Sequence, residues 1–466
     1  MVERASGAPS MQSDGTAAGP APFGYRQELR RSLGTGALLA YGLTLIAPTA
    51  VCAAFGVIYN ASAGMVPLVY IIGLVGMFFT ALSYVAMSRE FPLAGSAYAY
   101  AKATFGGGVG FLAGWAVTLD YLLSPALIYI AAAVAVNSVV PGIPLWVWGS
   151  ALLAVNTVIN LRGIQSVARV NSGLLLLQVL ALGLFVVLAI VAVMAGRAGA
   201  HLSLTPIYDH SHIFSGLAFG GVSIGMLNYL GFDAISTLSE EAKGGASSVA
   251  KATVLSLFLA SAVFIGASYL ACLFVLRRPS FPPGIPTYAA FYDIAAIVGG
   301  SWLKTVLSIA GVFLANVAGA LAAQAAIARL FFGMARDGRM PRSMAHVHPR
   351  WRVPDRATLV VSAVTLVLIV FFSTRLELLL TIVSFGALTG FLFVHAAVVR
   401  HFLWKKGSRD WLRHLLAPAL GFVVVAVVIY SMSGNAKRVG ACWMAAGVAI
   451  VLVGKVIRRP DRSQPG

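Results

Sequence analysis

Apolar residues are grouped into long runs that recur along most of the chain after residue 33. None of these runs alternates polar and apolar positions as the strand of a membrane barrel would. Most of the runs approach the roughly 20 residues that a helix needs to cross the hydrocarbon core of a bilayer. We therefore predict an all-α integral membrane protein with twelve transmembrane helices, at 36–58, 67–88, 109–137, 144–160, 170–195, 216–238, 252–276, 305–328, 358–373, 378–399, 415–432 and 440–456.

The composition supports this fold class and excludes others. The 466 residues are 59% hydrophobic and 10% charged, whereas a soluble domain carries roughly 25% charged residues. A soluble enzyme, a disordered protein and a fibrous repeat are therefore excluded. The chain has no nucleophile elbow, glycine-rich phosphate loop, CxxC or zinc-ligand spacing, so we expect no enzyme activity, no cofactor and no metal. His201, His210 and His212 share one loop, where solvated side chains are favoured over a metal site.

The net charge of +18 could indicate a nucleic-acid partner. The positive residues, however, are distributed among the loops as they are in a membrane protein. If the N-terminus lies inside, the outer loops hold only seven of the 33 Lys and Arg residues: Arg197, Arg277, Arg278, Lys304, Arg375, Lys437 and Arg438. Cytoplasmic loops carry an excess of Lys and Arg. We therefore expect both termini in the cytoplasm, a location in the cytoplasmic (inner) membrane, the lipid bilayer as partner, and no nucleic acid.

Two acidic residues lie within the predicted spans, Asp120 and Asp233. An Asp at the centre of a spanning helix costs about 2.5–3.5 kcal/mol on insertion scales. Asp120 lies about 16 Å into its span at 1.5 Å per residue, close to the midplane, and should face a polar cavity. There it can bind a proton or serve as counter-ion to a cationic substrate, helped by the neighbouring Tyr121. The alternative is a neutral structural acid bonded to another helix.

Two spans contain residues that interrupt a helix. In the first, Pro48 lacks an N–H group and Gly42 permits a bend. In the sixth, Gly220 and Gly221 precede a Gly231 that lies two residues before Asp233. Interrupted spans at matching positions of two halves indicate the substrate site of a transporter. A simple kink, or a glycine at a helix contact, is the alternative for each break taken singly.

Three motifs resemble a known family. Arg89–Tyr100, with Phe105-Gly and Gly110–Trp115, is similar to the inner loop of the amino acid–polyamine–organocation permeases. Tyr229–Glu241 resembles their sixth helix and its exit, and Met334–Pro341 the loop after their eighth helix. The resemblance covers about residues 30–455 and is nearest to the bacterial putrescine-importer group.

The resemblance implies a five-plus-five inverted repeat, with broken helices 1 and 6, and two additional C-terminal helices. Residues 1–33 are mostly Ala, Gly, Pro, Ser and charged residues without a long apolar run, which predicts a disordered cytoplasmic tail. The resemblance divides the remaining chain into a core (34–400, with repeats at about 34–195 and 216–400), two further helices (401–456) and a cytoplasmic C-terminal tail (457–466). It also implies alternating access around a midplane site. Carried over onto this sequence, the substrate contacts are Thr44, Leu45, Ile46, Ala47, Asp120, Tyr121, Leu230, Gly231, Phe232, Asp233, Phe313 and Ser384.

These features favour a secondary transporter that imports an amino acid or a polyamine such as putrescine, coupled to H⁺ through Asp120 and Asp233. Helix N-termini suit a carboxylate, whereas acids and aromatic faces suit an ammonium group. The sequence also departs from relatives: Val51–Phe55 lacks an acid that putrescine-importer relatives tend to carry, and Gln178 replaces a lysine of some proton-coupled relatives. The alternative function is a transporter-like receptor that senses the solute without net transport.

Overall fold

The computed structural model describes residues 29, 31–93, 95–139, 142–214, 221–282, 285–373, 376–432 and 434–457. In these ranges the regular structure is helical, apart from one isolated parallel bridge between Leu33 and Ala242. The α-helices are α1 (Thr35–Ile46), α2 (Ala50–Ala61), α3 (Val66–Glu90), α4 (Ser96–Phe105), α5 (Gly107–Val139), α6 (Leu145–Leu161), α7 (Ile164–Met194), α8 (His210–Phe214), α9 (Val222–Leu227), α10 (Gly245–Cys272), α11 (Ile285–Gly299), α12 (Ser301–Ser308), α13 (Ala315–Arg336), α14 (Asp355–Phe372), α15 (Leu376–Val398), α16 (Ala417–Ser431) and α17 (Gly434–Ile457).

Shorter helical segments connect or extend these helices. Two of them matter for the site: the 3₁₀-helix η3 (Phe232–Glu241) and the π-helix η4 (Ile309–Leu314). The others are η1 (Arg197–Gly199), η5 (Arg342–Ala345), η6 (Val399–Lys405) and η7 (Leu412–Leu416).

The helices confirm a multi-pass membrane protein. Within the part of the chain that the structure describes, eight apolar helical segments are long enough to cross a bilayer, and α1 with α2 would make a ninth span bent by 41°. Each of the twelve predicted apolar runs overlaps one or more helices. Leu176 and Val187 on α7 are 58% and 59% exposed. Apolar side chains exposed along such a helix are suited to contact with lipid.

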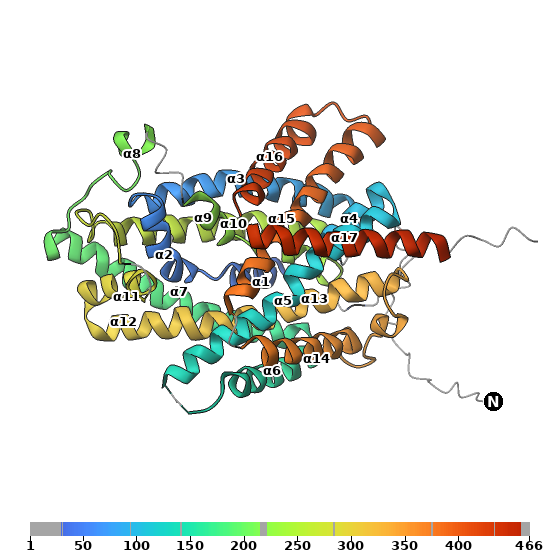
Figure 1. Ribbon diagram of the computed structural model, residues 1–466, viewed down its shortest axis with the longest axis horizontal. Helices are drawn as coiled ribbons and strands as arrows, with labels where there is room; N and C mark the ends of the chain where they lie inside the picture. The colour runs from blue at the N-terminus through green and yellow to red at the C-terminus, as the bar shows by residue number, and fades with distance from the viewer. Residues whose placement is uncertain are drawn as a thin grey trace, which may run out of the picture.

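Figure 1 shows the arrangement around the centre of the molecule, where α1 lies. Helices α2, α8 and α11 lie towards one end of the long axis, and α4 and the end of α17 lie towards the other. Helix α5 packs against α13 and α15, and α10 packs against α1 and α3. The central helices are thus covered on several sides, which is what a cavity-lining position at membrane depth requires.

Two short helices, α4 and α11, lie in segments between the predicted spans, where hydropathy alone did not predict a helix. Helix α4 is too short to span a bilayer and packs against α5 and α15, and its Tyr98 and Tyr100 are fully buried. Helix α11 packs in the same way against α2. Both helices are stabilised by burial against spanning helices and not by crossing the membrane.

Candidate functional site

The first predicted break lies at Ala47, directly before Pro48. Helix α1 ends at Ile46, Ala47 has a positive φ of 55°, and α2 begins at Ala50. Pro48 lies between them, as expected for a residue that cannot continue a helix. Gly42 stays helical and serves another purpose: a Cβ there would lie 2.8 Å from Cγ1 of Ile235. It allows η3 to approach α1 closely.

The second break lies between Leu227, where α9 ends, and Phe232, where η3 begins. Gly231 has a φ of 118°, a conformation that side chains rarely adopt. A Cβ on Gly231 would lie 2.7 Å from the Cβ of Leu45 and 3.1 Å from the backbone nitrogen of Ile46. The two breaks therefore touch each other. Gly220, also expected to interrupt this span, lies outside the described residues.

Asp233 is bound by groups from two elements beside this contact. The Tyr121 hydroxyl on α5 donates a hydrogen bond to Oδ2 of Asp233 at 2.5 Å, and the backbone N–H of Gly231 donates to Oδ1 at 3.3 Å. Asp233 is 3% exposed. The residue that forms the break thus also holds the carboxyl group.

Asp120 faces a different neighbour although it adjoins Tyr121 in sequence. Successive residues on a helix point about 100° apart, at 3.6 residues per turn. The hydroxyl of Ser124, one turn further along α5, donates to Oδ1 of Asp120 at 2.9 Å. A Cβ on Gly386 of α15 would lie 2.7 Å from the Asp120 nitrogen. Asp120 is 8% exposed and sits where α5 and α15 meet.

The remaining predicted site residues divide by burial. Those buried with the two acids are Thr44, Ile46, Tyr121 and Phe232, whereas the partly exposed ones are Leu45, Ala47, Leu230, Gly231, Phe313 and Ser384. Phe313 lies in η4, which packs against α2, α5 and α7. A π-helical segment inside a helix is frequent at functional sites. Ser384 lies on α15, the helix that packs against α5.

Gln178 contacts the break in helix 1. The Thr49 hydroxyl, in the linker between α1 and α2, donates to Oε1 of Gln178 on α7 at 3.3 Å. The sequence identified Gln178 through the resemblance alone, and the contact with Thr49 was not foreseen. Gln178 is neutral, so this hydrogen bond places no charge at the break.

An aromatic cluster lies next to Asp233, towards the end of the molecule at which α4 lies. It consists of Tyr84 on α3, Tyr100 on α4, Phe232 and Phe391 on α15, and all four rings are buried. The ring centroid of Tyr84 lies 6.0 Å from those of Tyr100 and Phe232 and 5.7 Å from that of Phe391, with edge-to-face geometry. Sequence reasoning missed this cluster, because its members come from four separate elements.

Two ion pairs close the same end of the molecule. Arg329 on α13 binds Glu241 through two hydrogen bonds, and Arg336 on α13 binds Glu240 at 2.7 and 3.1 Å. Both acids lie at the end of η3. We refer to these four residues as the inner clasp. The Glu240–Glu241 pair was visible in the sequence, but its partners on α13 were not.

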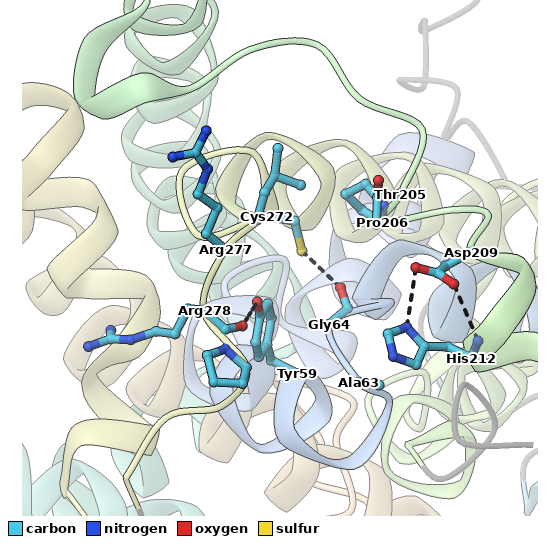
Figure 2. Close-up of a pocket in the computed structure, with 12 residues that line it drawn as sticks. Tyr59, Ala63, Gly64, Thr205, Pro206, Asp209, His212, Cys272, Arg277 and Arg278 are labelled. Carbon is cyan, nitrogen blue, oxygen red and sulfur yellow. Dashed lines mark hydrogen bonds and ion pairs between the residues drawn. The ribbon is translucent and has the colours of Figure 1, made fainter. Parts of the chain in front are cut away.

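A pocket of about 320 Å³ lies at the opposite end, between the end of α2, the end of α10 and the loop before α8 (Figure 2). Asp209 and His212 form one wall, with His212 Nδ1 3.4 Å from the carboxylate. The hydrogen bond from the Ser211 hydroxyl lowers the pKa of Asp209 below its usual value. Across the described residues, no group of three His, Cys, Asp or Glu side chains is arranged to hold a metal ion.

Buried carboxyl groups beside two broken, mutually contacting helices define a membrane transporter and not an enzyme. The chain belongs to the amino acid permease family, whose sequence model matches residues 36–454. It lies within the amino acid–polyamine–organocation superfamily expected from the three motifs.

Individual relatives extend over most of the chain. The low-affinity putrescine importer PlaP of Escherichia coli is 32% identical, over 94% of this chain and 97% of its own length. The branched-chain amino acid permease BcaP of Lactococcus lactis is 26% identical, over 80% of this chain and 83% of its own. A methylthioribose transporter of Bacillus subtilis is 24% identical, over 91% and 93%. The names of these three relatives refer to three different kinds of solute: a diamine, amino acids and a thiosugar.

Proposed function

We propose that this permease imports a small amine-bearing solute, an amino acid or a polyamine such as putrescine, by alternating access. The observation that carries the proposal is the position of Asp233, which binds Tyr121 and Gly231 at the contact between the two breaks. The similarity to a putrescine importer supports the same class of substrate. The site residues are those predicted from the sequence, with Asp120 and Asp233 as counter-ions for ammonium groups.

The helix ends around the site suit both kinds of substrate. The C-terminal end of α1 carries partial negative charge and favours an ammonium group, whereas the N-terminal ends of α2 and η3 carry partial positive charge and favour a carboxylate. A diamine has two ammonium groups, for which Asp120 and Asp233 supply two counter-ions. An amino acid would depend more on the unwound backbone at Ala47 and Gly231.

The proposed transport cycle uses an inverted repeat of two five-helix units within residues 34–400, followed by two further spans, which makes twelve. In this arrangement the inner clasp and the aromatic cluster form the barrier between the site and the cytoplasm. Release to the inside would separate the Arg329–Glu241 and Arg336–Glu240 pairs. Substrate would reach the site from the opposite side.

The proposed orientation places both termini in the cytoplasm of a bacterial cell. Reporter fusions within residues 400–414 are expected to read as cytoplasmic, because this segment carries Arg400, Lys405, Lys406, Arg409 and Arg413. Paired alkaline phosphatase and fluorescent protein fusions measure the side directly. An extracellular reading at this position would reverse the whole topology.

Coupling to H⁺ is part of the proposal, because Asp120 and Asp233 lie within predicted spans, where each can bind a proton. Gln178 stands where some proton-coupled relatives have a lysine, so coupling through that lysine is not available here. We expect uptake by proteoliposomes to require an inward proton gradient and to fall to the background level when a protonophore collapses it. Uptake that requires sodium and is unaffected by the protonophore would contradict this prediction. The two acids would then have a role in substrate binding but not in coupling.

The same proteoliposomes test the substrate class. A panel of labelled diamines, amino acids with different side chains, and a neutral thiosugar should separate amine-bearing solutes from others. We expect saturable uptake of at least one amine that unlabelled amine abolishes. Binding of an amine without net uptake would favour a receptor, and uptake of the thiosugar alone would contradict the proposed counter-ion role of the two acids.

A further inference from the structure

The segment that joins the last core helix to the two additional helices is folded into a defined hairpin. It comprises residues 399–416, with η6 and η7 as its two arms, and we call it the inner hairpin. The rings of Phe402 and His414 stack across it, with centroids 4.2 Å apart and planes 4° from parallel. The Ser408 hydroxyl lies 2.8 Å from Nδ1 of His414, and the Ser408 nitrogen donates to the Phe402 carbonyl at 2.8 Å.

The inner hairpin is also fixed to the body of the protein. Glu90, at the end of α3, pairs with Lys406 at 2.6 Å and with His401 at 3.3 Å. The ring of His401 packs against Phe91 with a centroid distance of 4.9 Å. These contacts hold the first arm against the body, and the stacking of His414 on Phe402 holds the second arm against the first. The outward-facing side chains of the hairpin are therefore displayed on a fixed surface.

That surface combines large apolar side chains with cations. Trp404, Trp411 and Leu412 are 76%, 63% and 67% exposed. The exposed Arg409 and Arg413 lie on the same segment. The only acid within 399–416 is Asp410, 3.6 Å from Arg413. The surface therefore carries an excess of positive charge next to two exposed indoles.

We propose that the inner hairpin binds the phosphate headgroup of an anionic phospholipid in the cytoplasmic leaflet. Both arms continue directly into membrane-spanning segments, Val383–Lys405 and Leu412–Ser431, so both indoles lie where the chain leaves the bilayer. Tryptophan is enriched at that depth, because its ring is apolar and its N–H group is polar. Arginine binds phosphate through paired hydrogen bonds.

Charge complementarity favours this partner. The cytoplasmic leaflet of a membrane with anionic lipids has a negative surface potential, which attracts cations close to a span. A soluble acidic protein would not need two indoles at the level of the membrane boundary. The proposal relies on the cytoplasmic orientation given above, but it does not depend on the transported solute, and its test does not use transport as a readout.

The test uses the purified full-length protein in a mild detergent, titrated with phosphatidylglycerol or with phosphatidylcholine of the same acyl chains. Native mass spectrometry counts the lipids retained. We expect phosphatidylglycerol to be retained selectively, and the double variant Arg409→Gln with Arg413→Gln to bind it about 30-fold more weakly at low salt. Trp404→Ala should weaken retention as well, because it removes the interfacial ring.

The matched control is Arg277→Gln with Arg278→Gln, which removes two exposed arginines beside the pocket of Figure 2. We expect this variant to retain phosphatidylglycerol as the unchanged protein does. Equal retention of the two lipids would overturn the proposal, as would full retention by the Arg409 and Arg413 variant. An equal loss in both double variants would show binding to positive charge in general and would also overturn it.

Variant quality is checked by the melting temperature and by the elution profile. Both arginines are exposed, so we expect the double variant to fold normally. If the double variant nevertheless proves unstable, brominated phosphatidylglycerol gives a second readout on the unchanged protein. We expect it to quench tryptophan fluorescence more than brominated phosphatidylcholine does, and Trp404→Phe with Trp411→Phe should remove that difference. No difference between the two brominated lipids on the unchanged protein would contradict the proposal.

Discussion

Gly231→Ala is expected to reduce uptake at least 30-fold. The alanine would have to adopt a φ near 118°. Its Cβ would lie 2.7 Å from the Cβ of Leu45 and 2.9 Å from the carbonyl carbon of Leu45. A left-handed conformation costs about 1–2 kcal/mol for a residue with a side chain, and overpacking costs about 1–3 kcal/mol more. The two breaks would move apart, and the hydrogen bond from the Gly231 N–H to the Asp233 carboxyl group would be lost. Initial uptake rates by proteoliposomes measure the effect.

Gly266→Ala is the matched control, because Gly266 lies within α10 and a Cβ there meets no atom within 4 Å. Alanine also has the higher helix propensity. We expect normal uptake and equal or greater abundance for this variant. Normal uptake by Gly231→Ala, at normal abundance, would show that the contact between the two breaks is not needed for transport.

Asp120→Asn is expected to weaken binding of amine substrates about 5–30-fold. The change keeps the shape of the side chain and removes its charge. A hydrogen bond to a charged group contributes about 1.5–3 kcal/mol, against about 1 kcal/mol between neutral groups, so the loss is about 1–2 kcal/mol. The loss should be the same for amines with and without a carboxylate. Substrate affinity can be measured by scintillation proximity on purified protein.

Asp293→Asn makes the same chemical change at an exposed position, where Asp293 pairs with Lys304 at 2.7 Å. An exposed pair contributes little, so affinity should not change. If Asp120→Asn binds substrate normally at normal abundance, Asp120 is a neutral structural acid bonded to Ser124, and Asp233 or the backbone binds the amine. An equal loss in both variants would indicate a general effect of net charge.

The sequence by itself determined the class of protein and the positions of its main elements. Hydropathy is a local property that a run of some 20 residues expresses directly, so each predicted apolar run overlaps one or more of the described helices. The break in helix 1 was visible from Pro48, because a missing N–H group acts wherever the chain folds. Asp120 and Asp233 stood out because a charge within a span is costly in any packing.

Only the tertiary structure decided which of these residues meet. Gly231 touches Leu45, and Tyr121 binds Asp233 and not the adjacent Asp120, because helix packing sets which faces approach. The contact of Gln178 with Thr49 and the pairing of Glu241 with Arg329 follow from the same cause. Each of these contacts joins residues that are distant in sequence. Local patterns carry no information on such contacts, whereas the packed helices fix them within a few ångströms.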